Sequence, residues 1–493
     1  RHAGARYVVI TDMNPYRPEV REYVLAGFEQ KVRETVPYGV SVWSLGDECG
    51  YSDSVGFGEK SRVHFDEFLK YKYGTIAKFN AVHGTDYKDF PEVPHKTVQQ
   101  SVKDADWASW YDQVQYSEKM YSDLYQMLSK AIKKYDPNAR VGAEGSAAGD
   151  LEQTVAGLEF WGPYRSLVND ELLRNIAPDR VRGTWWGGYL RSTRNGFPVQ
   201  QWEYVLTGTV NADEWFAVTP GSTEGAFVGD LTFYPYVTKM MPHLKPLRRG
   251  LAQLLIRTPF RNDGFALYYN HHSTQASKLD DRLLPPNDSQ GDFIRFCYRK
   301  GYEARFVTPK TLDRLKGLKV LFLAGASALS DAEVLAILDF ARAGGILVAD
   351  TVPAVLNEYL VPRTANPLAE CFGAKLLKDL PSPESQACDF KATVTHGDTA
   401  SSLAMKSAQL KTFPGMDGLV WTPVGKGGAL LLNFTLSSAL VSTDEGAVDA
   451  LLQGILDLKG IRNPESVAGL PADGTIFRVR ELPLGKGADG EPA

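Results

Sequence analysis

Short apolar runs alternate with amphipathic segments through the first half of the chain. Residues 7–15 begin as a β-branched apolar run and end in a polar loop closed by Pro15, and residues 40–45 form a second largely apolar run. Residues 18–35 between them carry apolar side chains at helical spacing. A strand, a helix and a strand in this order predict a right-handed βαβ unit with parallel strands. The same alternation predicts a long helix over residues 107–135, and further strands at residues 140–144, 158–161, 181–186 and 215–219.

This alternation predicts an α/β fold with a (β/α)8 TIM-type barrel over residues 1–245. About six strand-like segments precede residue 235, whereas a closed barrel of this type needs eight. An open sheet would expose unpaired edges. We therefore expect the N-terminal strands of the barrel to lie on a part of the same polypeptide outside this sequence.

A second α/β pattern follows the barrel segment. Strand-like runs at residues 264–269, 304–307, 319–324 and 344–350 are separated by helical segments, one of them with a predicted cap at Ser330. This order predicts a doubly wound domain with a parallel sheet over residues 246–375. Residues 376–493 carry short strand-like runs, at 419–424 and 429–434, before a helix at 447–458. They predict a small β-rich C-terminal domain with a disordered tail.

Composition narrows the class of protein. The 493 residues are 43% hydrophobic with a net charge of -5, which is ordinary for a globular protein and opposes a nucleic-acid partner. The longest apolar runs are too short to span a membrane, so no membrane partner is expected. The four cysteines are widely spaced and match no ligand pattern. Neither a metal site nor a cofactor is predicted, and His83, beside a turn glycine, is expected to be solvated.

Candidate catalytic chemistry begins where the run at residues 40–45 ends. The segment closes with Gly46, Asp47 and Glu48, as a barrel strand does when it delivers a carboxylate to the barrel mouth. Glu48 is therefore the first candidate for a general acid. The alternative interpretation is a strand followed by an ordinary polar turn.

Glycosidic cleavage generally needs a second carboxyl group. Glu144 ends the neighbouring strand and is flanked by small residues that leave room for a ligand, so it is the preferred partner. Glu224, in a loop after the last strand, comes second, and Asp12 ends the strand on the other side of Glu48. Each acid has the alternative interpretation of a surface or helix-capping residue.

Polar and aromatic residues near the same strand ends predict a carbohydrate-binding surface. Asp47, Asp12 and Asn14 would hydrogen-bond the substrate, and aromatic rings can stack on sugar faces. The candidate aromatic residues are Trp161, Trp185, Trp186 and Tyr189, although one of the adjacent tryptophans is expected to fill the barrel. Arg165, Arg182, Arg191 and Arg194 would suit an anionic sugar, or are solvated surface.

The motifs Trp-Ser-Leu-Gly-Asp-Glu at residues 43–48 and Phe-Leu-Lys-Tyr-Lys-Tyr-Gly-Thr-Ile at residues 68–76 resemble glycoside hydrolase family 42, the trimeric β-galactosidases. Residues 318–350 resemble that family's amidotransferase-like trimerisation domain. The resemblance implies a retaining hydrolase of a (β/α)8 clan and a homotrimer. It also implies that Glu48 is the acid/base, while Asp47 replaces an asparagine that would donate a hydrogen bond to a sugar.

Two departures from the family pattern stand out. The nucleophile glutamate is expected near residues 182–189, where no carboxylate occurs, and the family's zinc-binding cysteine cluster is absent from the sequence. The working hypothesis is a glycoside hydrolase acting on a β-galactoside-type bond in an oligosaccharide or polysaccharide, modified or sulfated galactans included. A protein that degrades a polysaccharide is expected to be periplasmic or secreted. A protein with a smaller substrate is expected to be cytoplasmic. The competing hypothesis is a catalytically inactive sugar-binding or assembly subunit.

Overall fold

Apolar runs in the first part of the chain form a parallel sheet, as their pattern predicts. The computed structural model describes residues 14–51, 58–145, 149–163, 166–183, 185–186, 202, 205–206, 213–214, 227–442 and 445–462. Contacts divide the chain into unit 1 (residues 1–164 and 179–182) and unit 2 (residues 165–178 and 183–493). Each unit is described by itself.

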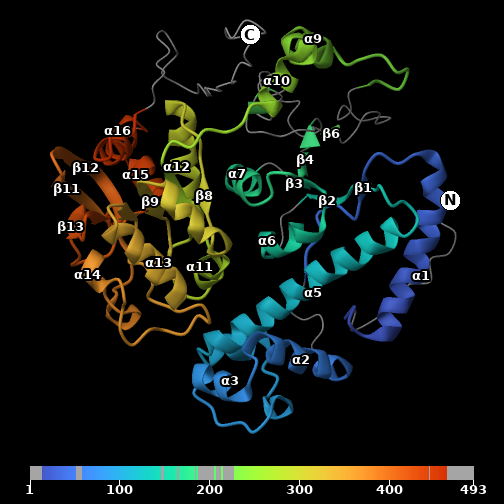
Figure 1. Cartoon of the computed structure of the whole chain (residues 1–493), viewed down its shortest axis with the longest axis horizontal. Helices are drawn as coiled ribbons and strands as arrows, with labels where there is room; N and C mark the ends of the chain where they lie inside the picture. Colours follow the sequence, from blue (N-terminus) through green and yellow to red (C-terminus); the bar gives the residue numbers. More distant parts are fainter. Residues whose placement is uncertain are drawn as a thin grey trace, which may run out of the picture. The chain divides into compact units, whose positions relative to one another are not determined.

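The sheet of unit 1 has the order β1-β2-β3-β4, and its neighbouring strands are parallel (Figure 1). These strands are β1 (Trp43–Ser44), β2 (Val141–Gly145), β3 (Phe160–Pro163) and β4 (Val181–Arg182). The helices of this unit are α1 (Pro18–Thr35), α2 (Arg62–Tyr73), α3 (Ile76–His83), α4 (Val98–Lys103), α5 (Trp107–Lys133) and α6 (Leu151–Thr154). The predicted strand at residues 7–15 lies almost wholly outside the described residues.

One face of this sheet packs against α1 and α5, the two long helices of the unit (Figure 1). Val32 of α1 and Ile132 of α5 form a buried cluster with Val141 of β2, and Trp43 and Leu45 pack against it. Side chains on a strand alternate between the two faces. Val141 and Ala143 therefore share the helix-covered face, and Gly142 and Glu144 share the opposite face.

A buried polar cluster joins α2, α3 and α5. Asp112 of α5 lies 2.5 Å from the Lys72 ammonium and accepts a hydrogen bond from the Tyr73 hydroxyl at 2.7 Å. His83 Nε2 lies 3.1 Å from the other carboxylate oxygen, and its side chain is only 3% exposed. The expectation that His83 is solvated is wrong, because the ring also stacks on Phe79. The sequence around His83 predicts a turn but gives no sign that α5 packs over this side chain.

Unit 2 contains a six-stranded sheet of order β13-β14-β10-β9-β7-β8, in which only the edge strand β13 is antiparallel. Its strands are β7 (Phe265–Tyr268), β8 (Phe306–Val307), β9 (Val320–Leu323), β10 (Ile346–Ala349), β13 (Val420–Val424) and β14 (Gly427–Leu431). Its central strands are buried on both faces, which explains their continuous apolar runs.

Helices cover both faces of this sheet (Figure 1). On one face, α13 (Asp331–Arg342) and α14 (Ala369–Phe372) contribute to one core with alternate strand residues such as Leu321 and Leu347. On the other face, Phe293 of α12 (Asn287–Lys300) packs against Phe322. The Ser330 hydroxyl accepts a hydrogen bond from the Glu333 amide, and Glu333 returns one, so α13 begins at the predicted cap.

The C-terminal strands correct the predicted organisation of unit 2. Strands β13 and β14 extend the six-stranded sheet, whereas the sequence predicted them in a separate β-rich domain over residues 376–493. The reason is register: the Gly427–Leu431 strand pairs in parallel with β10, a contact between segments far apart in the chain. Strands β11 (Glu384–His396) and β12 (Thr399–Thr412) form a separate antiparallel hairpin.

The remaining elements of unit 2 are shorter or peripheral. Strands β5 (Trp185–Trp186) and β6 (Asp213–Glu214) pair in parallel. No helix in the described ranges is long and apolar enough to cross a membrane. The other helices of the unit are α7 (Leu167–Ile176), α9 (Pro235–Pro246), α10 (Ala252–Arg257), α11 (His271–Ala276), α15 (Leu436–Ser442) and α16 (Glu445–Asp457).

The Asp112 cluster gives a test of what holds unit 1 together. Burial opposes ionisation of Asp112, but Lys72 and His83 outweigh it, so the pKa of this carboxyl lies below its usual value. We expect Asp112→Asn to lower the free energy of unfolding by about 3 to 5 kcal/mol near neutral pH, because it removes the buried carboxylate that pairs with the Lys72 ammonium. Urea denaturation followed by tryptophan fluorescence measures this loss.

The pH dependence of this loss has a defined sign. A carboxyl with a lowered pKa stabilises the fold above its unfolded-state pKa of about 3.9, and this contribution disappears as the pH falls through the folded-state value. The difference between Asp112→Asn and the parent should therefore shrink in acid. Asp104→Asn is the control, since its side chain is 37% exposed. It should change stability by no more than about 0.5 kcal/mol. A constant difference across the acid range would contradict this account.

Candidate functional site

The loop after β1 presents two carboxylates. Asp47 and Glu48 are both exposed and follow Gly46, at which the extended strand backbone has ended. Glu48 has φ 52°, in the left-handed region that non-glycine residues rarely adopt. Such a conformation persists only where surrounding contacts impose it.

The end of β2 imposes this conformation. The Glu144 amide donates a hydrogen bond to the Gly46 carbonyl at 3.0 Å, so the two strand ends lie side by side. Gly145 has φ 82°, and a Cβ atom built there would lie 2.3 Å from the Glu48 nitrogen and 2.6 Å from Asp47 Oδ1. Only glycine fits this position. The Glu48 loop and the Glu144 strand end are therefore joined by direct backbone contact.

Glu144 is half-buried and lies on the face of the sheet opposite α5. It is paired in register with Gly162 of β3, where an added Cβ atom would lie 2.9 Å from the Phe160 ring and 3.6 Å from Glu144 Cβ. The prediction that Glu48 and Glu144 end adjacent strands is confirmed, since β1 and β2 pair with Trp43 opposite Val141. Neighbouring strands are about 4.8 Å apart, so both side chains belong to one edge of the sheet.

Helix α5 supports the loop with tyrosine hydroxyls that sequence reasoning missed. The Tyr121 hydroxyl donates a hydrogen bond to the Cys49 carbonyl at 2.9 Å and contacts the Tyr125 hydroxyl at 2.7 Å. Burial raises the pKa of Tyr121 to about 12, which keeps its hydroxyl protonated as a donor. The Tyr51 hydroxyl donates to buried Glu118 at 3.0 Å. The tyrosine-rich pattern of this helix was the available signal, but it gave no indication of the loop it supports.

Two predicted substrate-binding residues are buried. Trp161 is 1% exposed and is paired with Ala143 on the helix-covered face, so its ring packs in the core. The prediction that Trp161 lies at the rim of the site is therefore wrong. Asn14 is 0% exposed, donates a hydrogen bond to the Tyr116 hydroxyl and accepts one from the Tyr16 amide. The alternation of side chains along β3 decides the position of Trp161. The position of Asn14 depends on its contact with Tyr116, which lies 102 positions away in sequence.

The other predicted residues are only partly described. Arg182 is buried at the end of β4. Its burial argues against the alternative that it is a solvated surface residue. Trp185 and Trp186 form β5, of which only the backbone is described. Seven predictions stay untested because the residues lie outside the described part of the chain, namely Asp12, Arg165, Tyr189, Arg191, Arg194 and Glu224 together with the strand at residues 215–219.

The described residues contain no cluster of three or more histidine, cysteine or acidic side chains that could hold a metal ion. All four cysteines are free thiols. Cys49, beside the candidate acid, has its sulfur 3.6 Å from the Asp47 carbonyl. The described side chains at this edge of the sheet include carboxyl groups, a thiol and hydroxyl donors.

Residues 1–155 match the family model of glycoside hydrolase family 42, described as Beta-galactosidase. The matched stretch contains both Glu48 and Glu144. Over these residues the chain is similar to glycoside hydrolase family 42. The predicted resemblance is confirmed over this stretch, and the similarity is to β-galactosidase-like glycosidases. No curated protein matches the chain.

Solved structures agree with this relationship at the level of the fold. The β-galactosidase from Bacillus circulans sp. alkalophilus is 13% identical with a TM-score of 0.67, over 91% of this chain and 73% of that one. The β-galactosidase from the psychrophilic Marinomonas ef1 is 13% identical with a TM-score of 0.65, over 95% and 77%. The family 42 exo-carrageenase from Bacteroides ovatus is 14% identical with a TM-score of 0.53, over 94% and 63%.

The close approach of Gly145 to the Glu48 loop can be tested by substitution. We expect Gly145→Ala to destabilise the protein by about 2 to 4 kcal/mol, from left-handed backbone strain plus the clash with Glu48. Gly39→Ala is a matched control, because Gly39 has φ 70° but nothing within 4 Å of the added Cβ. It should cost only the strain of about 1 to 2 kcal/mol. Thermal denaturation compares the two, and equal losses would show that the close approach contributes nothing.

Proposed function

We propose that this chain is a glycoside hydrolase that cleaves a β-galactoside-type bond in an oligosaccharide or polysaccharide, with Glu48 as general acid. The observation that carries the proposal is the backbone contact between the Glu48 loop and the end of β2, which brings Glu144 to the same edge of the sheet. The family match over residues 1–155 covers both strands and supports it.

The proposed chemistry follows from the two carboxyl groups. Glu48 protonates the glycosidic oxygen as the bond to the departing sugar breaks, and it is exposed, so a substrate can reach it. Glu144 is the preferred partner, acting either as nucleophile or as the base that activates water. A separation of about 5 to 5.5 Å between the carboxyl groups would favour the first role, and about 6.5 to 9.5 Å the second. Glu224 remains the second choice for this partner.

The substrate proposed is a galactan, including modified or sulfated forms. The neighbour named as an exo-carrageenase supports a substrate panel that includes carrageenan beside neutral galactosides. The proposed assembly is a homotrimer, with residues 318–350 in the association domain. The parallel sheet of unit 1 is proposed to be part of a (β/α)8 barrel, which the likeness to β-galactosidase structures supports.

The first test uses Glu48→Gln with two substrates that differ only in the leaving group. We expect the variant to lose about 10²- to 10⁴-fold in kcat/KM on an unactivated galactoside, because the departing alkoxide is no longer protonated. In an aryl galactoside, the acidic phenol departs as a phenolate without protonation. The kcat/KM for this substrate should therefore fall much less. Initial rates of sugar and phenol release measure both values.

Glu144→Gln separates the second role. Loss of a nucleophile or base should slow both substrates to a similar extent, because neither role depends on the leaving group. Glu34→Gln is the control, since Glu34 is an exposed helix residue in the same unit. Equal activity of Glu48→Gln and the parent would remove Glu48 from the mechanism. Sugar binding without cleavage by the parent, across neutral and sulfated galactans, would favour the inactive sugar-binding subunit instead.

Tyr121→Phe tests the support of the loop. Removing the hydroxyl removes its hydrogen bond to the Cys49 carbonyl, and we expect kcat to fall about tenfold with little change in KM, because Glu48 loses its position and the substrate contacts are kept. The pH profile of kcat should keep its shape, since Tyr121 itself transfers no proton. Tyr38→Phe, whose side chain is 85% exposed, is the matched control. A larger effect on KM than on kcat would contradict the positioning role.

A further inference from the structure

A basic pocket in unit 2 has no role in the proposed hydrolysis. It has a volume of about 480 Å³ and is formed where the end of α7 meets the segments before β7 and around β8. Its lining includes Arg174, Asn175, Phe260, Asn262, Arg305 and Arg314, and no acidic residue. All of these residues belong to unit 2, whereas Glu48 and Glu144 belong to unit 1.

Arg305 is the fixed cation of this pocket. Its Nε donates a hydrogen bond to the Arg261 carbonyl at 2.9 Å, and its Nη2 donates to the Phe260 carbonyl at 3.0 Å. Two backbone acceptors hold the guanidinium plane in place but neutralise none of its charge. Burial and the neighbouring Arg174 lower the pKa of Arg305 from its ordinary value, although an arginine stays protonated near neutral pH.

Two further guanidinium groups share the pocket. Arg314 is exposed and donates a hydrogen bond to the Asn175 carbonyl at 3.2 Å. Arg174 is buried, ion-paired with Glu171, and lies 3.7 Å from the centre of the Phe260 ring. Arg305 and Arg314 make no ion pair among the described residues, although the Glu303 and Asp263 carboxylates lie near enough to Arg305 to oppose the lowering of its pKa. The pocket therefore has an excess of positive charge in a chain whose net charge is -5.

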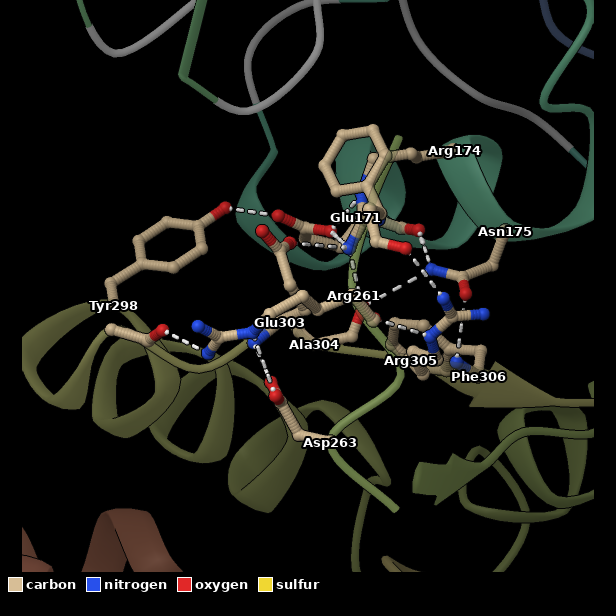
Figure 2. Close-up of polar contacts among 12 residues, drawn as sticks. Glu171, Arg174, Asn175, Arg261, Asp263, Tyr298, Glu303, Ala304, Arg305 and Phe306 are labelled. Carbon is tan, nitrogen blue, oxygen red and sulfur yellow. Dashed lines mark hydrogen bonds and ion pairs between the residues drawn. The ribbon is translucent and has the colours of Figure 1, made fainter. Parts of the chain in front are cut away.

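A buried network behind the pocket holds these groups in place (Figure 2). Arg174 and Asn175 of α7 both donate hydrogen bonds to the Ala304 carbonyl, and the Asn175 side chain accepts one from the Phe306 amide at 3.1 Å. These contacts bracket the backbone of Arg305. The Tyr298 hydroxyl donates to Glu171 at 2.5 Å, which fixes the acid that orients Arg174.

We propose that this pocket binds an oxyanion, either free or as the sulfate or phosphate ester of a sugar. The guanidinium fork matches the geometry of such groups and donates charge-assisted hydrogen bonds to them. An anion between Arg305 and Arg314 would also relieve their mutual repulsion. The volume of about 480 Å³ exceeds the room that one sulfate needs, which leaves space for an attached sugar ring. The site does not depend on the proposed catalytic role of Glu48.

Binding to the full chain tests the proposal directly. Calorimetric titrations use inorganic sulfate, inorganic phosphate, galactose 6-sulfate and galactose 6-phosphate, and we expect a Kd of about 1 mM or below for at least one ligand. Affinity should fall as sodium chloride is added, because the attraction is electrostatic. Tighter binding of an ester than of the matching ion identifies a sugar ester, whereas equal binding identifies the free ion. Binding of galactose 6-phosphate should strengthen as the pH rises through about 6, where its phosphate group gains a second negative charge, while sulfate binding should not.

Variants assign the binding to this pocket. Arg314→Gln and Arg305→Gln should each weaken binding by about tenfold or more. Arg314 is exposed, so its variant is expected to fold normally and keeps the test valid if Arg305→Gln does not fold. Arg342→Gln makes the same charge change at a side chain that is 53% exposed outside the pocket, and Glu48→Gln changes the candidate catalytic acid. Both should bind like the parent. Absence of binding by all four ligands, or equal affinities in Arg314→Gln and Arg342→Gln, would overturn the proposal.

Discussion

The contact between Gly145 and the Glu48 backbone is the constraint on which the candidate site depends. The Glu144 amide reaches the Gly46 carbonyl only because Gly145 has no side chain between β2 and the loop. The same contact holds Glu48 in its left-handed conformation and leaves its carboxyl exposed. Strain of this kind is typical of residues that must be presented rather than packed. The loop after β1 is therefore built from the neighbouring strand as much as from its own sequence.

The helix beneath the sheet completes this arrangement from the other side. Helix α5 packs its apolar residues against Val141 and also places the Tyr121 hydroxyl under the Cys49 carbonyl. The same helix carries Asp112, which joins it to α2 through Lys72 and to α3 through His83. One long amphipathic helix thus supports the sheet, the candidate catalytic loop and the adjoining helices. Changes in its packing should be transmitted to the loop because the interior is close-packed.

Unit 2 uses polar side chains to manage the edge of its sheet. Strand β8 is the outer strand, and Asn175 of α7 bonds to the backbone on both sides of Arg305 as a neighbouring strand would. This covers an edge that could otherwise pair with another chain. The arrangement also gathers Arg174, Arg305 and Arg314 around one pocket. The structural role of the covered edge and the proposed anion site are two consequences of the same packing.

Local sequence determined the elements and the first catalytic candidate. The apolar run ending at Ser44, the cap at Ser330 and the family motif at residues 43–48 depend on neighbouring residues, and neighbours in sequence constrain backbone conformation directly. Only the tertiary structure decided which distant segments meet. The burial of Trp161 and His83, the addition of β14 to β10 and the grouping of three arginines all depend on such meetings. Each arises from packing between segments far apart in the chain, and the pattern of a single segment does not encode its partner.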